Sequence, residues 1–135
     1  MKENPVIVYF EDDEKSRTVV SVILTRRMHI SQLTIFEDST NFLSRIEAVS
    51  PPPDLILLDI HMKPFNGFQM LAMLRGVERF KSVPVAALTA SVMNDEIQSL
   101  RDAGFGGCVS KPVNLALFPQ QIERLLSGEN VWSIV

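Results

Sequence analysis

The sequence is poor in the features that mark secreted, membrane-spanning or disulfide-stabilised proteins. Its 135 residues include one cysteine, Cys108, which cannot form an internal disulfide, and the first ten residues lack the apolar stretch of a signal peptide. The longest apolar runs, such as residues 6–10 and 83–88, fall far short of the roughly 20 residues that cross a bilayer. We therefore expect a protein of the reducing cytoplasm with no membrane contact.

The chain also lacks a large excess of either positive or negative charge. The formal net charge is −3, and the lysines and arginines are scattered along the chain rather than gathered into a basic stripe. We therefore expect no direct binding of nucleic acid. Hydrophobic residues are plentiful at 46% of the chain, which is enough for one ordinary domain to bury a core without disulfides.

Apolar runs alternate with segments of helical periodicity along the chain. A short run that is apolar at every position is typical of a buried parallel strand, whereas apolar residues three or four positions apart indicate a helix. The expected strands are residues 6–10, 32–36, 54–58, 83–88 and 105–110, and the expected helices are residues 14–28, 39–49, 68–77, 90–103 and 115–126. Because Pro119 has no backbone N–H, we expect the last helix to be irregular in its first turn or to start near Phe118.

This alternation predicts an α/β fold in which right-handed βαβ units build a three-layer, doubly wound parallel sheet covered by helices on both faces. Ligands of such sheets bind beyond the carboxyl ends of the strands. We expect one domain over residues 1–127, followed by residues 128–135 as a tail or the remnant of a linker.

Polar residues stand directly after four of the expected strands. They are Glu11 and Asp12 after the first strand, Asp59 after the third, Thr89 after the fourth and Lys111 after the fifth. Clustered carboxylates raise one another's pKa unless a cation neutralises them, and hard oxygen ligands suit Mg²⁺. Mg²⁺ keeps coordination positions for phosphate oxygens, and a lysine and a hydroxyl can hold the remaining oxygens. The set therefore favours phosphoryl chemistry.

Each of these residues also has an ordinary explanation when taken alone. Asp12 or Asp13 could cap the first helix, Thr89 could be a turn hydroxyl, and Lys111 could be a solvated surface lysine. Their joint placement at strand ends is what favours a common site.

The motifs around these residues occur in a specific order. The segment LLDIHM contains Asp59 and is followed by Gly67, PVAALTA contains Thr89, and SKPV contains Lys111. Thr89 comes 30 positions after Asp59, and Lys111 comes 22 positions after Thr89. In this respect the chain resembles the receiver domain of bacterial two-component response regulators, including chemotaxis regulators, over residues 5–126. The resemblance implies the flavodoxin-like strand order 2-1-3-4-5 and a phosphoryl group accepted from a sensor histidine kinase or phosphotransfer protein.

The same resemblance implies a role for each site residue. Asp59 would be the phosphoacceptor, Thr89 the switch hydroxyl and Lys111 the cation that pairs with the phosphoryl group, in a domain that catalyses only its own phosphorylation and dephosphorylation. The implied ligands of Mg²⁺ are the side chains of Glu11, Asp12 and Asp59 and the backbone carbonyl of His61. The bond before Pro112 is typically cis in this family. The signal would leave through the face of the fourth helix, fifth strand and fifth helix, toward an unknown effector.

Two positions depart from the family pattern. Cys108, 19 residues after Thr89, stands where many receivers carry a tyrosine or phenylalanine. Lys63 stands where a proline is common, and Pro64 follows it. We interpret Cys108 as a small buried residue rather than a redox switch.

Two other functions remain open. A degenerate receiver would mediate protein contacts without being phosphorylated. A phosphatase of the haloacid dehalogenase type would also use an aspartate nucleophile and Mg²⁺, but it needs a second aspartate where this chain has His61. Near the end of the sequence, Trp132 could belong to a linker or could cover an apolar patch.

Overall fold

The computed structural model describes residues 3–133 and contains all five expected strands, with shifts of one or two residues at some ends. They are β1 Val6–Phe10, β2 Gln32–Phe36, β3 Leu55–Asp59, β4 Val85–Thr89 and β5 Gly107–Ser110. Every residue of β1, β3 and β4 is buried, which explains why these segments are almost continuously apolar.

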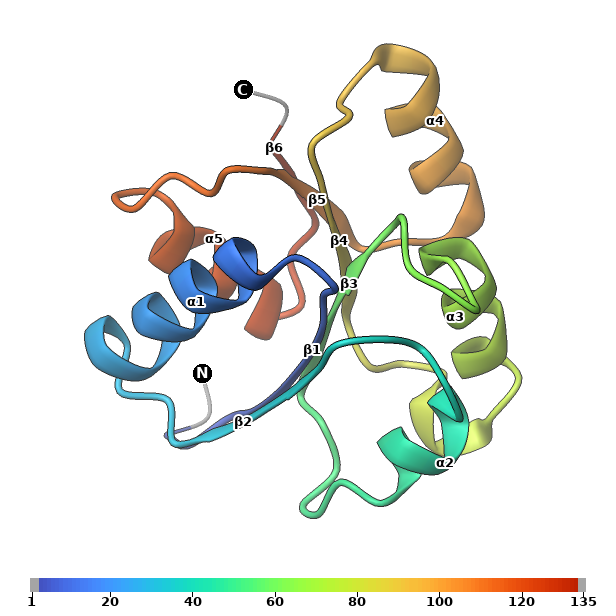
Figure 1. Ribbon diagram of the computed structural model, residues 1–135, viewed down its shortest axis with the longest axis horizontal. Coiled ribbons are helices and arrows are strands. Elements are labelled where there is room, and N and C mark those ends of the chain that lie inside the picture. The colour runs from blue at the N-terminus through green and yellow to red at the C-terminus, as the bar shows by residue number, and fades with distance from the viewer. Residues whose placement is uncertain (1–2, 134–135) are drawn as a thin grey trace.

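The strands form one parallel sheet in the order β2-β1-β3-β4-β5-β6, which confirms the expected order of the first five (Figure 1). The sixth strand, β6 Val131–Ser133, was not expected: it pairs in parallel with β5 and places Trp132 opposite Cys108. The segment expected as a tail over residues 128–135 therefore contains a strand, although residues 134–135 of that segment lie outside the described part. Three residues are too few to show a strand periodicity, so the sequence gives no sign of β6.

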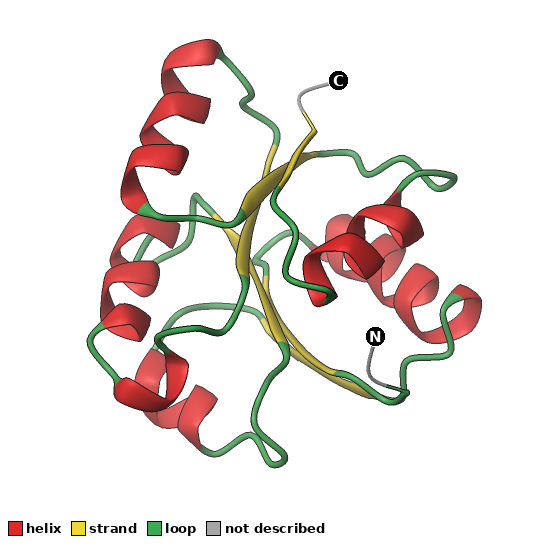
Figure 2. Ribbon diagram, turned by 180° about the vertical axis from the view of Figure 1, so that it is seen from behind, coloured by secondary structure: helices red, strands yellow, loops and turns green. Residues whose placement is uncertain are grey.

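Five α-helices in residues 3–133 cover the two faces of the sheet. They are α1 Glu14–Val22, α2 Phe42–Glu47, α3 Gly67–Arg75, α4 Asn94–Ala103 and α5 Phe118–Leu126. Helices α1 and α5 lie on one face and α2, α3 and α4 on the other, as the view from behind also shows (Figure 2). No helix in this described range is long and apolar enough to cross a membrane.

The first helix differs from its prediction over residues 14–28. Regular α-helix ends at Val22 and continues as a π-helical turn, η1 Ile23–Arg27, in which the N–H of Met28 donates to the carbonyl of Ile23 at 3.0 Å. The wider turn keeps Ile23 and Leu24 buried against the sheet. The apolar pattern predicted the helical face but not the type of turn.

The second helix starts later than its prediction at residue 39. The hydroxyl of Ser39 donates to the carbonyl of Phe65 at 2.8 Å and accepts from its N–H at 2.7 Å, so Ser39 serves the loop after β3. Asn41, with φ of 52°, then turns the chain into α2.

Residues after β4 also form a loop rather than the predicted start of a helix. The N–H of Ser91 donates to the Thr89 hydroxyl at 3.1 Å, and α4 begins only at Asn94. The last helix starts at Phe118 with Pro119 in its first turn, which confirms the expected start. A short 3₁₀ turn, η2 Glu78–Phe80, precedes β4 and was not predicted.

Candidate functional site

The strand ends bring the predicted polar residues to one edge of the sheet. Glu11 follows β1, Asp59 ends β3 and Thr89 ends β4, and all three are buried. The pairing of Phe10 with Leu58 and of Asp59 with Leu88 aligns the carboxyl ends of β1, β3 and β4. Parallel register thus assembles the site from segments far apart in the sequence.

Three carboxylates form the acidic part of the site. Ligand oxygens of Glu11, Asp12 and Asp59 all lie within 4.8 Å of one another. Glu11 and Asp59 are buried, whereas Asp12 is exposed and opens the cluster to solvent. Hard oxygen donors beside an open side fit Mg²⁺, which retains several water or phosphate ligands. This acidic cluster matches the magnesium site expected of a receiver.

Lys111 approaches the cluster from the end of β5. Its Nζ lies 3.0 and 3.1 Å from the two carboxylate oxygens of Glu11 and 3.6 Å from Oδ2 of Asp59. The hydroxyl of Tyr9 also donates to Glu11, at 2.8 Å. The charge of Glu11 is therefore well compensated, whereas Asp59 shares Lys111 as a more distant partner. The bond between Lys111 and Pro112 is cis, as expected.

Tyr9 is a site residue that the sequence reasoning missed, because it was counted as part of an apolar strand. The only available signal was chemical: a tyrosine buried in a strand needs a partner for its hydroxyl, and Glu11 lies two positions further along.

The environment of Asp59 disfavours its charged form when no metal is bound. Burial, followed by the neighbouring Glu11, raises the pKa of Asp59 from 3.8 to about 7, while Lys111 and the N–H of His61 oppose the rise. That N–H donates to Oδ1 of Asp59 at 3.2 Å, and the side chain of His61 is exposed. A cation beside Asp59 would convert it to a carboxylate, which is a competent nucleophile.

Thr89 lies at the same edge, but its hydroxyl accepts a hydrogen bond from Ser91. A cavity of about 180 Å³ adjoins it, lined by α3 and α4 residues together with His61 and Thr89. The loop after β4 therefore has free volume beside it.

Asp13 lies just outside the cluster and caps α1. Its Oδ2 accepts from the N–H of Ser16 at 2.9 Å and from the hydroxyl of Ser16 at 2.7 Å. The capping explanation is thus right for Asp13, whereas Asp12 belongs to the acidic cluster.

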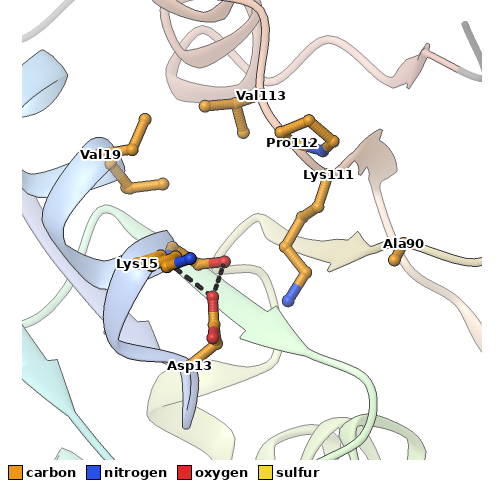
Figure 3. A pocket seen from close by; sticks show the side chains of 9 residues that line it. Asp13, Lys15, Val19, Ala90, Lys111, Pro112 and Val113 are labelled. Carbon is orange, nitrogen blue, oxygen red and sulfur yellow. Dashed lines mark hydrogen bonds between the residues drawn. The ribbon is translucent and has the colours of Figure 1, made fainter.

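A groove of about 440 Å³ opens beside Lys111, between α1 and the loop that follows β5. Figure 3 shows Val19 on α1 across from Pro112 and Val113 on the loop, with the lysine side chain extending from the loop into the space between. Val19 is 39% exposed. The sequence reasoning did not single out this surface, because α1 and the loop lie about 90 residues apart.

Comparison with known proteins agrees with this geometry. Residues 7–123 match the family described as response regulator receiver domain. Because this match covers most of the chain, the protein belongs to the response regulator receiver domain family.

A relative agrees with this family, and solved structures agree with the fold. Over 74 residues the chain is 32% identical to the polar-differentiation response regulator DivK of Brucella ovis, a match that covers 55% of this chain and 60% of that protein. The chemotaxis response regulator CheY4 of Vibrio cholerae superposes with a TM-score of 0.79 at 20% identity, over 90% of this chain and 98% of that chain. The receiver domain of a sensor histidine kinase of Pseudomonas aeruginosa PAO1, described with a magnesium ion in its active-site cleft, gives a TM-score of 0.79 at 23% identity, over 92% and 98%. At these identities the two structures establish the fold.

Proposed function

We propose that this receiver domain accepts a phosphoryl group on Asp59 in a Mg²⁺-dependent reaction and thereby switches its contacts with other proteins. The observation that carries the proposal is the placement of Asp59: its carboxylate is buried at a strand end, within 4.8 Å of the Glu11 and Asp12 oxygens and 3.6 Å from the ammonium of Lys111. A domain of this kind is a phosphoacceptor in signalling rather than an enzyme with a separate substrate.

The chain's own oxygens would hold the metal. The proposed ligands are the side chains of Glu11, Asp12 and Asp59 and the backbone carbonyl of His61. When bound, Mg²⁺ would offset negative charge on the phosphoryl oxygens. Asp12 is the exposed member of the cluster, so it would be the direct ligand most open to exchange with solvent.

The phosphodonor would be a phosphohistidine of a sensor histidine kinase or phosphotransfer protein. An oxygen of Asp59 attacks the phosphorus in line, the bond from phosphorus to the imidazole nitrogen breaks, and the product is an aspartyl phosphate. Lys111 contributes a point charge to one phosphoryl oxygen, and the hydroxyl of Thr89 turns from Ser91 to donate to another.

The groove beside Lys111 is the proposed docking surface for the donor. Its walls are apolar at Val19, Pro112 and Val113, and the ammonium of Lys111 lies at its inner end (Figure 3). Helix α1 and the loop before α5 carry three further exposed apolar side chains, namely Val22, Leu115 and Leu117. A helix that carries the phosphohistidine would place its apolar face here and its imidazole beside Asp59.

The signal would leave by the face that contains α4 and α5, toward an effector protein. This face was expected to include the edge of β5, but β6 pairs with β5 and covers that edge. The surface offered to an effector is therefore built by α4, β6 and α5 (Figure 1).

One experiment separates this function from the two alternatives. The protein is incubated with Mg²⁺ and acetyl phosphate, and phosphoprotein and released phosphate are both measured. A receiver gains one stable phosphoryl group that Asp59→Asn abolishes. A phosphatase of the haloacid dehalogenase type releases phosphate continuously, and a degenerate receiver does neither.

A further inference from the structure

Strand β6 is built into the sheet by a specific glycine. A Cβ atom placed on Gly107 would fall against the carbonyl oxygen of Val131, with the carbonyl carbon and the amide nitrogen of Val131 each 3.1 Å away. A Cβ on the neighbouring Gly106 would meet the carbonyl oxygen of Val85 at 3.5 Å, which is an ordinary contact. Position 107 therefore has room for β6 only because it lacks a side chain.

Trp132 links this strand to α4. Residues that pair in parallel register project to the same face, so Trp132 and its partner Cys108 both face the layer that contains α4. The guanidinium carbon of Arg101, on α4, lies 4.4 Å from the centre of the indole ring. The structure thus supports the second reading of Trp132, that it covers an apolar patch. Cys108 stands where many receivers carry a tyrosine or phenylalanine, and here Trp132 on β6 places an aromatic ring beside that position.

Helix α4 has few other anchors. Of its ten residues, Ile97 and Leu100 are the buried ones. With two buried side chains α4 is weakly anchored to the sheet, and the stack of Arg101 on Trp132 adds one further contact.

The loop before α4 connects this attachment to the phosphorylation site. Thr89 ends β4 and its hydroxyl is bonded to Ser91, three residues before α4 begins at Asn94. If the Thr89 side chain rotates to donate to a phosphoryl group on Asp59, its oxygen moves away from the N–H of Ser91 and this bond is lost. The adjoining cavity of about 180 Å³, which Glu96 and Leu100 of α4 also line, gives the loop and the helix room to follow.

We propose that β6 is an intramolecular latch, closed on α4 through the stack of Trp132 and Arg101 in the unphosphorylated protein and released when Asp59 is phosphorylated. Movement of α4 toward the site carries Arg101 away from the indole, and Trp132 then loses this contact with the helix. This release rests on the phosphorylation of Asp59 proposed above. Coupling of two equilibria is reciprocal, so opening the latch must also favour the phosphorylated conformation.

Trp132 is the chain's single tryptophan, so its fluorescence reports the latch directly. The protein is treated with Mg²⁺ and acetyl phosphate while intact mass, tryptophan emission and hydrogen exchange over residues 129–133 are followed. Release predicts red-shifted emission and faster exchange as Asp59 becomes labelled, with neither change in Asp59→Asn. Labelling without these changes overturns the latch alone, whereas absence of labelling overturns the proposed function and the latch with it.

Reciprocity is tested with a matched pair of glycine variants. Gly107→Ala should open the latch without a phosphodonor, whereas Gly106→Ala should behave as the wild type. The affinity of each for beryllium trifluoride with Mg²⁺, a non-covalent mimic of the phosphoryl group, is measured by calorimetry. We expect Gly107→Ala to bind about fivefold more tightly or better. An open latch with unchanged affinity overturns the coupling.

A second pair of variants tests the same coupling without replacing Gly107, so that a general folding defect of Gly107→Ala cannot explain the result. Arg101→Ala removes the stack on Trp132, and Arg79→Ala removes a similar stack, 5.0 Å from the ring of Phe80, at the distant η2 turn. Both arginines are exposed. Tighter binding of beryllium trifluoride by Arg101→Ala but not by Arg79→Ala supports the latch, and equal affinities for the two variants overturn it.

Discussion

Lys111 and Glu11, 100 positions apart in the sequence, form an ion pair in which Nζ lies 3.0 and 3.1 Å from the two carboxylate oxygens. Because Tyr9 donates to the same carboxylate, the charge of Glu11 is compensated more fully than that of Asp59, whose Oδ2 lies 3.6 Å from the ammonium of Lys111. Two buried carboxylates at one edge of the sheet thus differ in what they can do. Glu11 holds the lysine in place, and Asp59 remains the group available for chemistry.

Magnesium should stabilise the folded protein through the acidic cluster. We expect millimolar Mg²⁺ to raise the melting temperature of the wild type, because a ligand that binds only the folded state stabilises it by mass action. Asp12→Asn should lose most of this rise in melting temperature, since it removes one of the three carboxylates proposed to bind the metal.

The control for this effect is Asp13→Asn, one position further along. Asparagine caps a helix about as well as aspartate, so this variant keeps α1 and changes the net charge equally. Thermal melts with and without Mg²⁺ compare the three proteins. An equal loss in Asp12→Asn and Asp13→Asn would mean that Mg²⁺ responds to net charge rather than to a site.

The raised pKa of Asp59 predicts a pH-dependent cost of folding in the absence of metal. Its pKa is about 7 in the folded protein against 3.8 in the ordinary case, so the folded protein retains a proton that the unfolded chain releases. Stability from this group is present below about pH 4 and is lost as the pH rises through about 7. Asp59→Asn should therefore raise the free energy of unfolding at pH 8 by about 1–3 kcal/mol, and the gain should vanish toward pH 4.

Urea titrations in a chelator at several pH values measure this gain. Asp38→Asn is the comparison of opposite sign, because the hydrogen bond from Arg45 lowers the pKa of Asp38 and stabilises its charged form. The burial argument fails for Asp59 if its variant gains the same stability at pH 4 as at pH 8.

Replacement of Lys111 should affect both folding and phosphorylation. Lys111→Gln leaves the buried Glu11 without its cation, which should cost about 3 kcal/mol of stability, and it removes the charge expected to hold a phosphoryl oxygen. Labelling by acetyl phosphate should fall at least about tenfold. Lys15→Gln is the control, since Lys15 lines the same groove but is exposed and lies outside the ion pair. Normal labelling of folded Lys111→Gln would remove Lys111 from the chemistry.

Cys108 should be chemically silent in the folded protein. Burial, with a smaller contribution from Glu96, raises the pKa of its thiol to about 11, so little thiolate is present at pH 8 and the sulfur is shielded from solvent. Alkylation by iodoacetamide should be about a hundredfold slower than in urea, because it requires opening of the structure. Comparable rates in the two states would show that β6 and α4 do not cover this position.

The sequence predicts the core of the fold because the central strands are buried on both faces. Strands β1, β3 and β4 appear as short, almost purely apolar runs, and the site residues Asp59 and Thr89 are the polar residues that end two of them. The strand order came from the resemblance to a family rather than from the pattern of residues.

The features that escaped prediction depend on contacts between distant segments or on differences too small to read from spacing. The π-helical turn η1 cannot be distinguished from α-helix within five residues. The late start of α2 depends on Ser39 bonding Phe65, 26 positions away. Strand β6 is only three residues long, and its fit depends on the missing side chain of Gly107.

Identification of the modified residue tests the central claim most directly. The protein is phosphorylated with acetyl phosphate and Mg²⁺, then reduced with borohydride, which converts an aspartyl phosphate to homoserine, and its peptides are sequenced by mass spectrometry. We predict conversion at Asp59 in a Mg²⁺-dependent manner, with Glu11 and Asp12 unchanged. Conversion at either of those carboxylates, or none at position 59 under conditions that leave the protein folded, would contradict the account.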